Sequence, residues 1–293
     1  MDAVITYVNG QDPIWQQSFR EYAGAPAVTK HFRDWGTLKY LLRGIETHLP
    51  FIRNVYLVVA GESQIPEWAD RENLHIVLHE DIIPHGFLPV FNSTAIEMFL
   101  HRIQGLGEEV LYFNDDFFPV ADCRAEDFFE NGRAFIKFSR HIFAGNMYKK
   151  HVRNSDRLAR RAAGLAPSLF FLRPQHTCYP MMRSESERLY GLVESEILAS
   201  VTRVRNERNC NGGLYQSYLY HRGLTGPSRT SGKYFSLALN SAERIGEYIL
   251  APKRNFVCIN DVQLDEETFV RYRATLIAAF EKKFPNKSRF ELR

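Results

Sequence analysis

The sequence lacks the features that mark membrane-spanning, disulfide-rich and secreted chains. No apolar run approaches the roughly 20 residues needed to cross a bilayer, and the first segment, Ala3–Val8, is typical of a strand rather than of a leader peptide. The four cysteines show no C-x-x-C spacing, so we expect reduced thiols and no zinc site built on them. The net charge of +3 argues neither for nor against a polyanionic partner. We therefore expect a soluble, cytoplasmic protein.

What remains is typical of a globular α/β domain. Of the 293 residues 45% are hydrophobic and 24% charged, without a long linker, repeat or low-complexity tract, which predicts one domain over 1–293. Apolar runs predict strands over 4–8, 54–60, 74–78 and 110–113, and helical periodicity predicts helices over 36–48 and 94–104. Strands separated by helical crossovers indicate a three-layer, mostly parallel sheet. Residues 150–222 are predicted to be mainly helical, followed by a strand over 255–259 and a helix over 266–284.

Polar clusters follow three of the predicted strands, at the edge where ligands bind to parallel sheets. They are Asn9, Gly10 and Asp12 after the first, Asn114–Asp116 after a later one, and Asn260–Asp261 after the last. Adjacent carboxylates such as Asp115 and Asp116 repel each other, and a divalent cation relieves that repulsion. Oxygen ligands suit Mg²⁺ or Mn²⁺. A solvated turn is the alternative at Asn114–Asp116, and a helix N-cap before Pro13 is the alternative for Asp12.

Several further residues have both a chemical and a structural interpretation. Arg33 has the geometry of a bidentate phosphate ligand. Glu97 and His101 share a helix face as a candidate acid/base pair, whereas Thr94 and Glu97 fit a capping box. His176, in a loop between two prolines, is either structural or a proton carrier.

Two basic features have the same ambiguity. Arg208 precedes a Gly-rich segment and an aromatic helix, so this segment either binds an anion or simply caps the helix. Six basic residues lie between Lys149 and Arg161, a run that is either a solvated helix face or an electrostatic contact with a polyanion; no aromatic ladder for base stacking accompanies it.

Taken together, these segments resemble the Stealth family of sugar-1-phosphate transferases, which includes capsule polysaccharide phosphotransferases and the catalytic part of N-acetylglucosamine-1-phosphotransferase. The resemblance extends over nearly the whole chain, in four blocks in the family's order. The first block is Asp2–Trp15. The second runs from Phe32–Trp35 to Tyr112–Asp116 and includes Leu38–Ile45 and Phe91–Glu97. The third is the region from Asn154 to His221, and the fourth is Asn255–Asp261 with Phe290–Leu292.

The resemblance implies a glycosyltransferase-A-like, Rossmann-like fold and a specific reaction. An acceptor hydroxyl attacks the sugar-proximal phosphorus of a UDP-sugar, with UDP-N-acetylglucosamine as the favoured donor, forming a phosphodiester and releasing UMP in capsule or cell-surface polysaccharide synthesis. It also implies a division into a nucleotide-sugar-binding core over 1–140, a helical acceptor-side region over 141–250 and a closing strand and helix over 251–293. The growing polymer is a polyanion, which the basic run would hold.

The resemblance further implies roles for individual residues. Asp115 and Asp116 would bind Mg²⁺ or Mn²⁺. The catalytic residues would be His176 as the base, Glu97, Arg208 and Asp261. The remaining substrate-binding residues would be Asn9, Gly10, Asp12, Arg33, Asp34, Asn92, Ser93, His101, Arg102, Asn154 and Asn260.

The chain departs from the family pattern at three places, one of which is Gly36-Thr37 after Trp35, where many relatives have a glutamate. Asn211-Gly212 stands where relatives have an acidic pair, and Tyr179 stands at the second histidine of a His-x-x-His pattern. Two alternatives therefore stay open, an ordinary glycosyltransferase that releases UDP and a catalytically idle saccharide- or nucleotide-sugar-binding protein. The expected partners are a UDP-sugar and a saccharide or phosphosaccharide acceptor, with no nucleic acid. Peripheral association with a membrane-bound capsule machinery is also expected.

Overall fold

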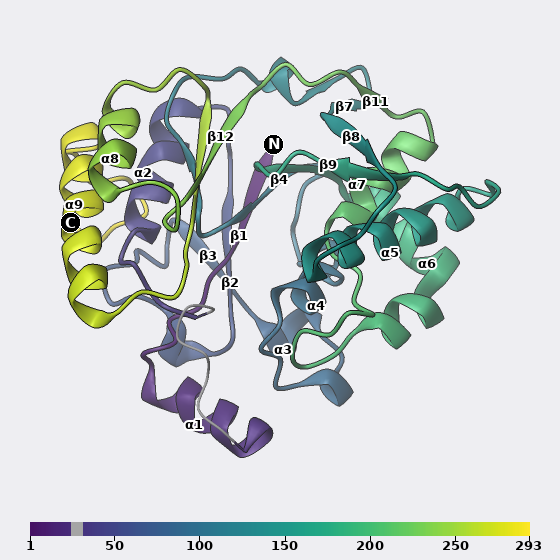
Figure 1. The fold of residues 1–293 in the computed structure, drawn as a ribbon, viewed down its shortest axis with the longest axis horizontal. Coiled ribbons are helices and arrows are strands. Elements are labelled where there is room, and N and C mark those ends of the chain that lie inside the picture. The colour runs from purple at the N-terminus through teal and green to yellow at the C-terminus, as the bar shows by residue number, and fades with distance from the viewer. Residues whose placement is uncertain (25–31) are drawn as a thin grey trace.

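A five-stranded sheet forms the centre of the protein in the computed structural model, which describes residues 1–24 and 32–293 (Figure 1). Its strand order is β10-β4-β1-β2-β3. β1, β2, β3 and β4 are parallel, and β10 runs antiparallel to β4 at the edge. The mostly parallel α/β sheet confirms the predicted fold class. The five strands span Asp2–Thr6 (β1), Val55–Val59 (β2), Leu74–Leu78 (β3), Glu109–Asn114 (β4) and Tyr179–Met182 (β10).

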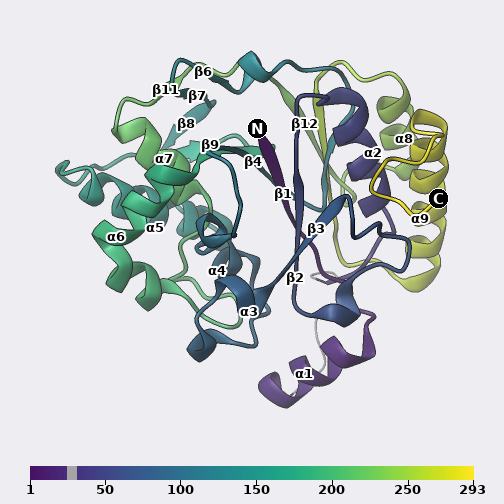
Figure 2. The ribbon, with the colours of Figure 1, turned by 180° about the vertical axis from the view of Figure 1, so that it is seen from behind.

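Helices cover both faces of this sheet, so the architecture has three layers. In Figures 1 and 2, α2, α8 and α9 lie on one side and α3 to α7 on the other, while α1 protrudes at one end. The α-helices span Pro13–Ala23 (α1), Leu38–His48 (α2), His79–Ile82 (α3), Ser93–Glu97 (α4), Met147–Ala162 (α5), Arg183–Ser200 (α6), Gly213–His221 (α7), Ala242–Leu250 (α8) and Glu266–Lys283 (α9). Among the helices of the described ranges, none has the length and apolar character needed to cross a membrane.

Three smaller sheets extend the structure around this centre. Their orders are β12-β13-β5, β8-β9 and β11-β7-β6. Their strands span Phe117–Pro119 (β5), Phe129–Glu130 (β6), Arg133–Phe135 (β7), Phe138–His141 (β8), Phe171–Pro174 (β9), Thr225–Gly226 (β11), Gly232–Ser236 (β12) and Phe256–Asn260 (β13).

The predicted elements of the first 120 residues are confirmed, with one exception. The predicted helix over 94–104 is wrong: α4 ends at Glu97, and the chain continues as a separate 3-10 turn over Leu100–Arg102. The reason is a tighter hydrogen-bond pattern, since the amides of Met98 and Phe99 bond the carbonyls three residues earlier. The region predicted to be mainly helical contains α5, α6 and α7 but also contributes β10 to the main sheet. Its assignment as an acceptor-side unit stays a prediction.

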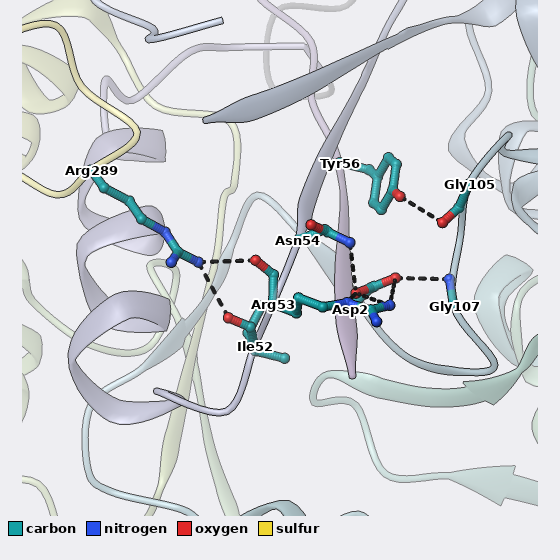
Figure 3. Close-up of polar contacts among 8 residues, drawn as sticks. All are labelled: Asp2, Ile52, Arg53, Asn54, Tyr56, Gly105, Gly107 and Arg289. Atoms are coloured by element: carbon teal, nitrogen blue, oxygen red, sulfur yellow. Dashed lines mark hydrogen bonds and ion pairs between the residues drawn. The ribbon is translucent and has the colours of Figure 1, made fainter. Parts of the chain in front are cut away.

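A buried carboxylate secures the N-terminal end of β1 (Figure 3). Asp2 is 0% exposed and accepts hydrogen bonds from the Gly107 amide at 2.7 Å, the Asn54 side chain at 3.2 Å and the Arg53 guanidinium. Nearby, Tyr56 donates to the Gly105 carbonyl, and Arg289 donates to the carbonyls of Ile52 and Arg53. This network joins β1, the start of β2 and the loop before β4 at the sheet edge opposite the strands' carboxyl ends.

We expect Asp2→Asn to lower the free energy of unfolding by about 1.5–3 kcal/mol, because a charge-assisted acceptor is lost and its donors stay in place. Urea denaturation measures this. The matched control is Glu67→Gln at an exposed position, where a change within about 0.5 kcal/mol is expected. Equal effects of the two substitutions would contradict the anchoring role of Asp2.

Candidate active site

A large cleft lies at the carboxyl ends of the central strands. β1 lies between β2 and β4, so the strand order reverses between β1 and β4, and Thr6 pairs with Asn114 in register. Where the strand order reverses, the connections after the two neighbouring strands run in opposite directions, and a crevice opens between them. The cleft has a volume of about 1340 Å³ and is lined by the residues that follow β1 and β4 and by residues of α4, α5, β9 and β13.

Asp115 and Asp116 occupy a tight turn between β4 and β5 on the cleft wall. β5 pairs antiparallel with β13, which brings the last strand of the chain beside this turn. The Ile259 amide donates to the Asp116 carbonyl at 3.0 Å, and the Cys258 thiol donates to Asp116 Oδ2 at 3.4 Å. Two segments more than 140 positions apart in sequence therefore build one site.

The two carboxylates fit a divalent cation. Burial, with Asp116 and Asp34 as further causes, raises the pKa of Asp115 to about 8, and burial raises the pKa of Asp116 to about 6. Asp116 Oδ1 is buried and accepts no hydrogen bond from any residue of the described ranges. A cation would relieve the repulsion and satisfy this oxygen. The predicted metal ligands thus have the environment that a metal site needs.

His176 and Cys258 lie close enough to Asp116 to extend this ligand set. One donor atom from each of the three residues lies within 4.8 Å of the others. The sequence predicted no metal site with a cysteine ligand, because no two cysteines are suitably spaced; here Cys258 reaches the site from a different strand. Burial, with Asp116 as a further cause, raises the pKa of the Cys258 thiol well above its usual value. A protonated thiol acts as a donor to Asp116, which leaves oxygen atoms as the available anionic ligands.

His176 projects from the loop between β9 and β10 into the cleft lining. Its Nδ1 lies 2.8 Å from the hydroxyl of Tyr179, the residue that replaces the family's second histidine. Burial, with Arg173 as a second cause, lowers the pKa of His176 to about 4. The imidazole is therefore neutral near pH 7. When Nδ1–H donates to Tyr179, Nε2 carries the lone pair that a base requires.

The predicted capping box of Thr94 and Glu97 is wrong, because Glu97 makes other contacts. Asn92 caps α4 by accepting from the Thr94 amide at 3.2 Å. Glu97 Oε2 instead accepts from the Gly212 amide, before α7, at 2.5 Å, and Oε1 lies 3.3 Å from the Tyr112 hydroxyl. The Gly-rich segment thus binds an anion that belongs to this chain. Burial raises the pKa of Glu97 to about 7.

The predicted Glu97–His101 pair does not form, because α4 ends at Glu97 and His101 points into the core. His101 Nδ1 lies 3.3 Å from the Tyr215 hydroxyl. Ten of the predicted site residues line the cleft. They are Arg33, Asp34, Asn92, Ser93, Glu97, Asp115, Asp116, His176, Asn260 and Asp261.

The other predicted residues lie outside the cleft lining, where most have structural contacts. Asp12 caps α1 and also accepts from Ser63 and Gln64. A side chain at Gly10 would meet the Phe32 carbonyl at 2.3 Å, so this position is a close backbone contact. The residues outside the lining are Asn9, Gly10, Asp12, His101, Arg102, Asn154 and Arg208.

The basic residues that line the cleft do not include Arg208, the predicted one. Arg208 lies outside the cleft lining, whereas Arg205, Arg173 and Lys137 are part of it. Arg205 donates to Ser93 Oγ at 2.9 Å, and its charge lowers the pKa of Glu97 after burial has raised it. Both Arg205 and Arg208 lie in one polar loop, so no local pattern distinguishes them. The turn of the chain before α7 decides which arginine faces the cleft.

Arg33 and Asp261 join the two ends of the chain at the cleft. Arg33 Nη1 lies 3.9 Å from Asp261 Oδ1, and the guanidinium lies 4.4 Å from the centre of the Phe269 ring. The Arg33 side chain is 4% exposed. This packing fixes the guanidinium at the cleft wall, where it is a cation of defined position.

Comparisons with known proteins identify relatives over the whole chain. Residues 31–136 match a family model described as Stealth protein CR2, conserved region 2. The chain is 30% identical to the capsular polysaccharide phosphotransferase WcwK of Streptococcus pneumoniae and to the receptor polysaccharide phosphotransferase WefC of Streptococcus oralis, with 100% of this chain and 99% of each relative covered.

Two further comparisons cover nearly all of this chain. It is 30% identical to an exopolysaccharide phosphotransferase of Streptomyces coelicolor, with 99% of this chain and 51% of the relative covered. Among solved structures, the galactosyltransferase LgtC in complex with donor and acceptor sugar analogues has a TM-score of 0.42 and 12% identity, with 95% of this chain and 96% of that chain covered. The full-length similarity at 30% identity and the matching conserved region show that this chain belongs to the Stealth family.

Proposed function

We propose that this chain transfers a sugar phosphate from a nucleotide-diphosphate sugar to a hydroxyl of a saccharide acceptor during capsule or cell-surface polysaccharide synthesis. The observation that carries the proposal is the convergence of a carboxylate pair, a neutral histidine and several cations in one cleft. The relatives are named as polysaccharide phosphotransferases. At about 1340 Å³ the cleft exceeds the 300–1,000 Å³ typical of a site for one small ligand, which suits two substrates.

The donor in this proposal is a UDP-sugar, with UDP-N-acetylglucosamine preferred, and the leaving group is UMP. The acceptor oxygen forms a bond to the sugar-proximal phosphorus, and the bond from that phosphorus to the bridging oxygen breaks. UMP departs with the bridging oxygen, and the anomeric bond stays intact. The hydroxyl proton passes to His176, whose neutral imidazole supports this assignment.

Charge neutralisation is the other requirement of phosphoryl transfer. Asp115 and Asp116 would hold Mg²⁺ or Mn²⁺, which neutralises diphosphate charge when bound. Arg205, Arg173 and Arg33 supply fixed positive charge along the cleft. Asp34, Asn260 and Asp261 line the same wall and are proposed donor-binding residues.

A donor screen tests the proposal. We expect UMP release from a UDP-sugar in the presence of an acceptor, abolished by EDTA and restored by Mg²⁺ or Mn²⁺, and ³¹P NMR should detect a phosphodiester. UDP release would instead show an ordinary glycosyltransferase. Tight donor binding without turnover across an acceptor panel would show an idle binding protein.

For Glu97→Gln we expect turnover to fall about tenfold to a hundredfold, because the cleft loses a carboxylate charge, and contacts to a charged group contribute about 1.5–3 kcal/mol. Glutamine keeps an acceptor for the Gly212 amide, so the melting temperature should stay close to that of the wild type. UMP release and thermal unfolding measure the two effects, with exposed Glu267→Gln as the control. Unchanged turnover would limit Glu97 to a structural role.

A further inference from the structure

An exposed apolar tip ends the small β8-β9 sheet. His141 pairs with Phe171 at the last position of this sheet, so the residues just beyond it on the two strands are neighbours. These residues are large, apolar and exposed to solvent: Ile142 (44%), Phe143 (81%), Leu169 (77%) and Phe170 (50%). These side chains do not pack into the core, and an exposed apolar group of this kind marks a contact with an apolar phase.

A row of cations lies beside this tip on α5. Lys149, Arg153 and Arg157 recur every four residues and so share one face of the helix, and Arg160 continues it. The opposite face is buried through His151, Val152, Ser155 and Ala159. We call Lys149, Arg153, Arg157 and Arg160 the cationic stripe, and Ile142, Phe143, Leu169 and Phe170 the apolar tip.

The stripe and the tip belong to one surface. α5 contacts β9 directly, and Arg160 donates to the Ala166 carbonyl in the loop that leads to Leu169. Burial, with Arg173 and Lys149 as further causes, lowers the pKa of His141. The Lys149 charge therefore lies near the end of β8. Arg140, exposed on β8, adds another cation.

The stripe is not neutralised by the part of the protein that the structure describes. Within residues 1–24 and 32–293, the lysines and arginines of α5 that form ion pairs are Lys150, with Glu207, and Arg161, with Glu196, and both lie outside the stripe. None of the four stripe residues has an ion pair in this part of the chain. An unneutralised row of cations attracts anionic surfaces.

We propose that the apolar tip and the cationic stripe form a docking surface for an anionic lipid bilayer. Aromatic and aliphatic side chains enter the acyl boundary while nearby lysines and arginines contact acidic headgroups. A soluble polyanion would account for the stripe but leave the apolar tip without a role. The surface also adjoins the cleft, since Asn146, Met147 and Tyr148 at the start of α5 line it. Docking would hold this rim of the cleft close to the membrane.

Vesicle co-sedimentation of the full chain tests the proposal independently of catalysis. We expect binding to vesicles of phosphatidylcholine with phosphatidylglycerol, weakened by salt, and little binding to phosphatidylcholine alone. The tip variant Phe143→Ser/Leu169→Ser and the stripe variant Lys149→Glu/Arg157→Glu should each lower the partition coefficient at least about tenfold, since one cation near such a surface contributes about fivefold.

The matched control is Leu239→Ser/Lys282→Glu, an exposed leucine shortly before α8 and an exposed lysine of α9. α8 and α9 lie on the opposite side of the molecule from α5 (Figures 1 and 2). It should bind as the wild type does, and circular dichroism should show all variants folded. Absence of wild-type binding to anionic vesicles, or equal binding by the tip variant, would overturn the proposal. Retention on soluble polyphosphate without vesicle binding would also overturn it and assign the stripe to a soluble polyanion.

Discussion

Asp116→Asn is expected to lower the rate of sugar-phosphate transfer at least about a thousandfold, because a bound divalent cation contributes several kcal/mol of charge stabilisation in such reactions. Asp116 Oδ1 is a buried carboxylate oxygen that accepts no hydrogen bond within the described ranges, so it is available to bind a cation. UMP release at saturating Mg²⁺ measures the rate, and calorimetry of UDP-sugar binding with and without Mg²⁺ measures the metal dependence.

The fold should survive this substitution. Burial raises the pKa of both Asp115 and Asp116, so the ionised pair destabilises the protein without metal, and a neutral asparagine removes part of the repulsion. We expect the melting temperature of Asp116→Asn without metal to equal or exceed that of the wild type. Mg²⁺ should raise the melting temperature of the wild type but not that of Asp116→Asn.

The matched control is Asp265→Asn, which keeps a side-chain cap on α9 at an exposed position outside the cleft lining. It should retain transfer activity and the stabilisation by Mg²⁺. Near-wild-type activity of Asp116→Asn would remove the carboxylate pair from the mechanism and return Asn114–Asp116 to the solvated-turn interpretation.

His176→Gln is expected to lower turnover by about 10²–10⁴, the range typical of a lost general base. Affinity for the donor should stay nearly unchanged, because the proposed role of His176 concerns the acceptor proton. Steady-state kinetics and donor calorimetry separate the two quantities. Glutamine fills more of the space between Phe117 and Tyr179 than alanine does, which limits any loss of packing around the ring.

Tyr179→Phe is the companion variant for His176. It removes the hydroxyl 2.8 Å from Nδ1 and keeps the aromatic ring. If Tyr179 orients the imidazole, turnover should fall by less than in His176→Gln, with the donor affinity again preserved. Wild-type-like turnover of His176→Gln would exclude His176 as the base.

The strand-end carboxylates were predictable because their signal is local. A β-branched and aromatic run followed by polar residues predicts both a buried strand and its carboxyl end, and parallel strands bring those ends to one edge. Asp115 and Asp116 therefore needed no knowledge of distant contacts. The same holds for Asp12, where the pattern before Pro13 predicted the cap that the structure has.

Three other features depended on contacts between distant segments. Glu97 fits a capping box by spacing, yet its partner is the Gly212 amide, 115 positions away. Cys258 reaches Asp116 through the pairing of β13 with β5. Arg205 rather than Arg208 lines the cleft, and both arginines stand in the same polar loop. Local periodicity carries no information on such contacts.

By itself the sequence determined the α/β class, the family and the place of Asp115 and Asp116 at a strand end, because apolar periodicity and short motifs act over a few residues. Only the tertiary structure decided which side chains share the cleft and which support its walls. It also decided that the basic run has an unpaired face beside an apolar tip. The physical reason is that burial, repulsion and hydrogen bonding at the cleft arise between segments that the chain brings together only when the sheets form.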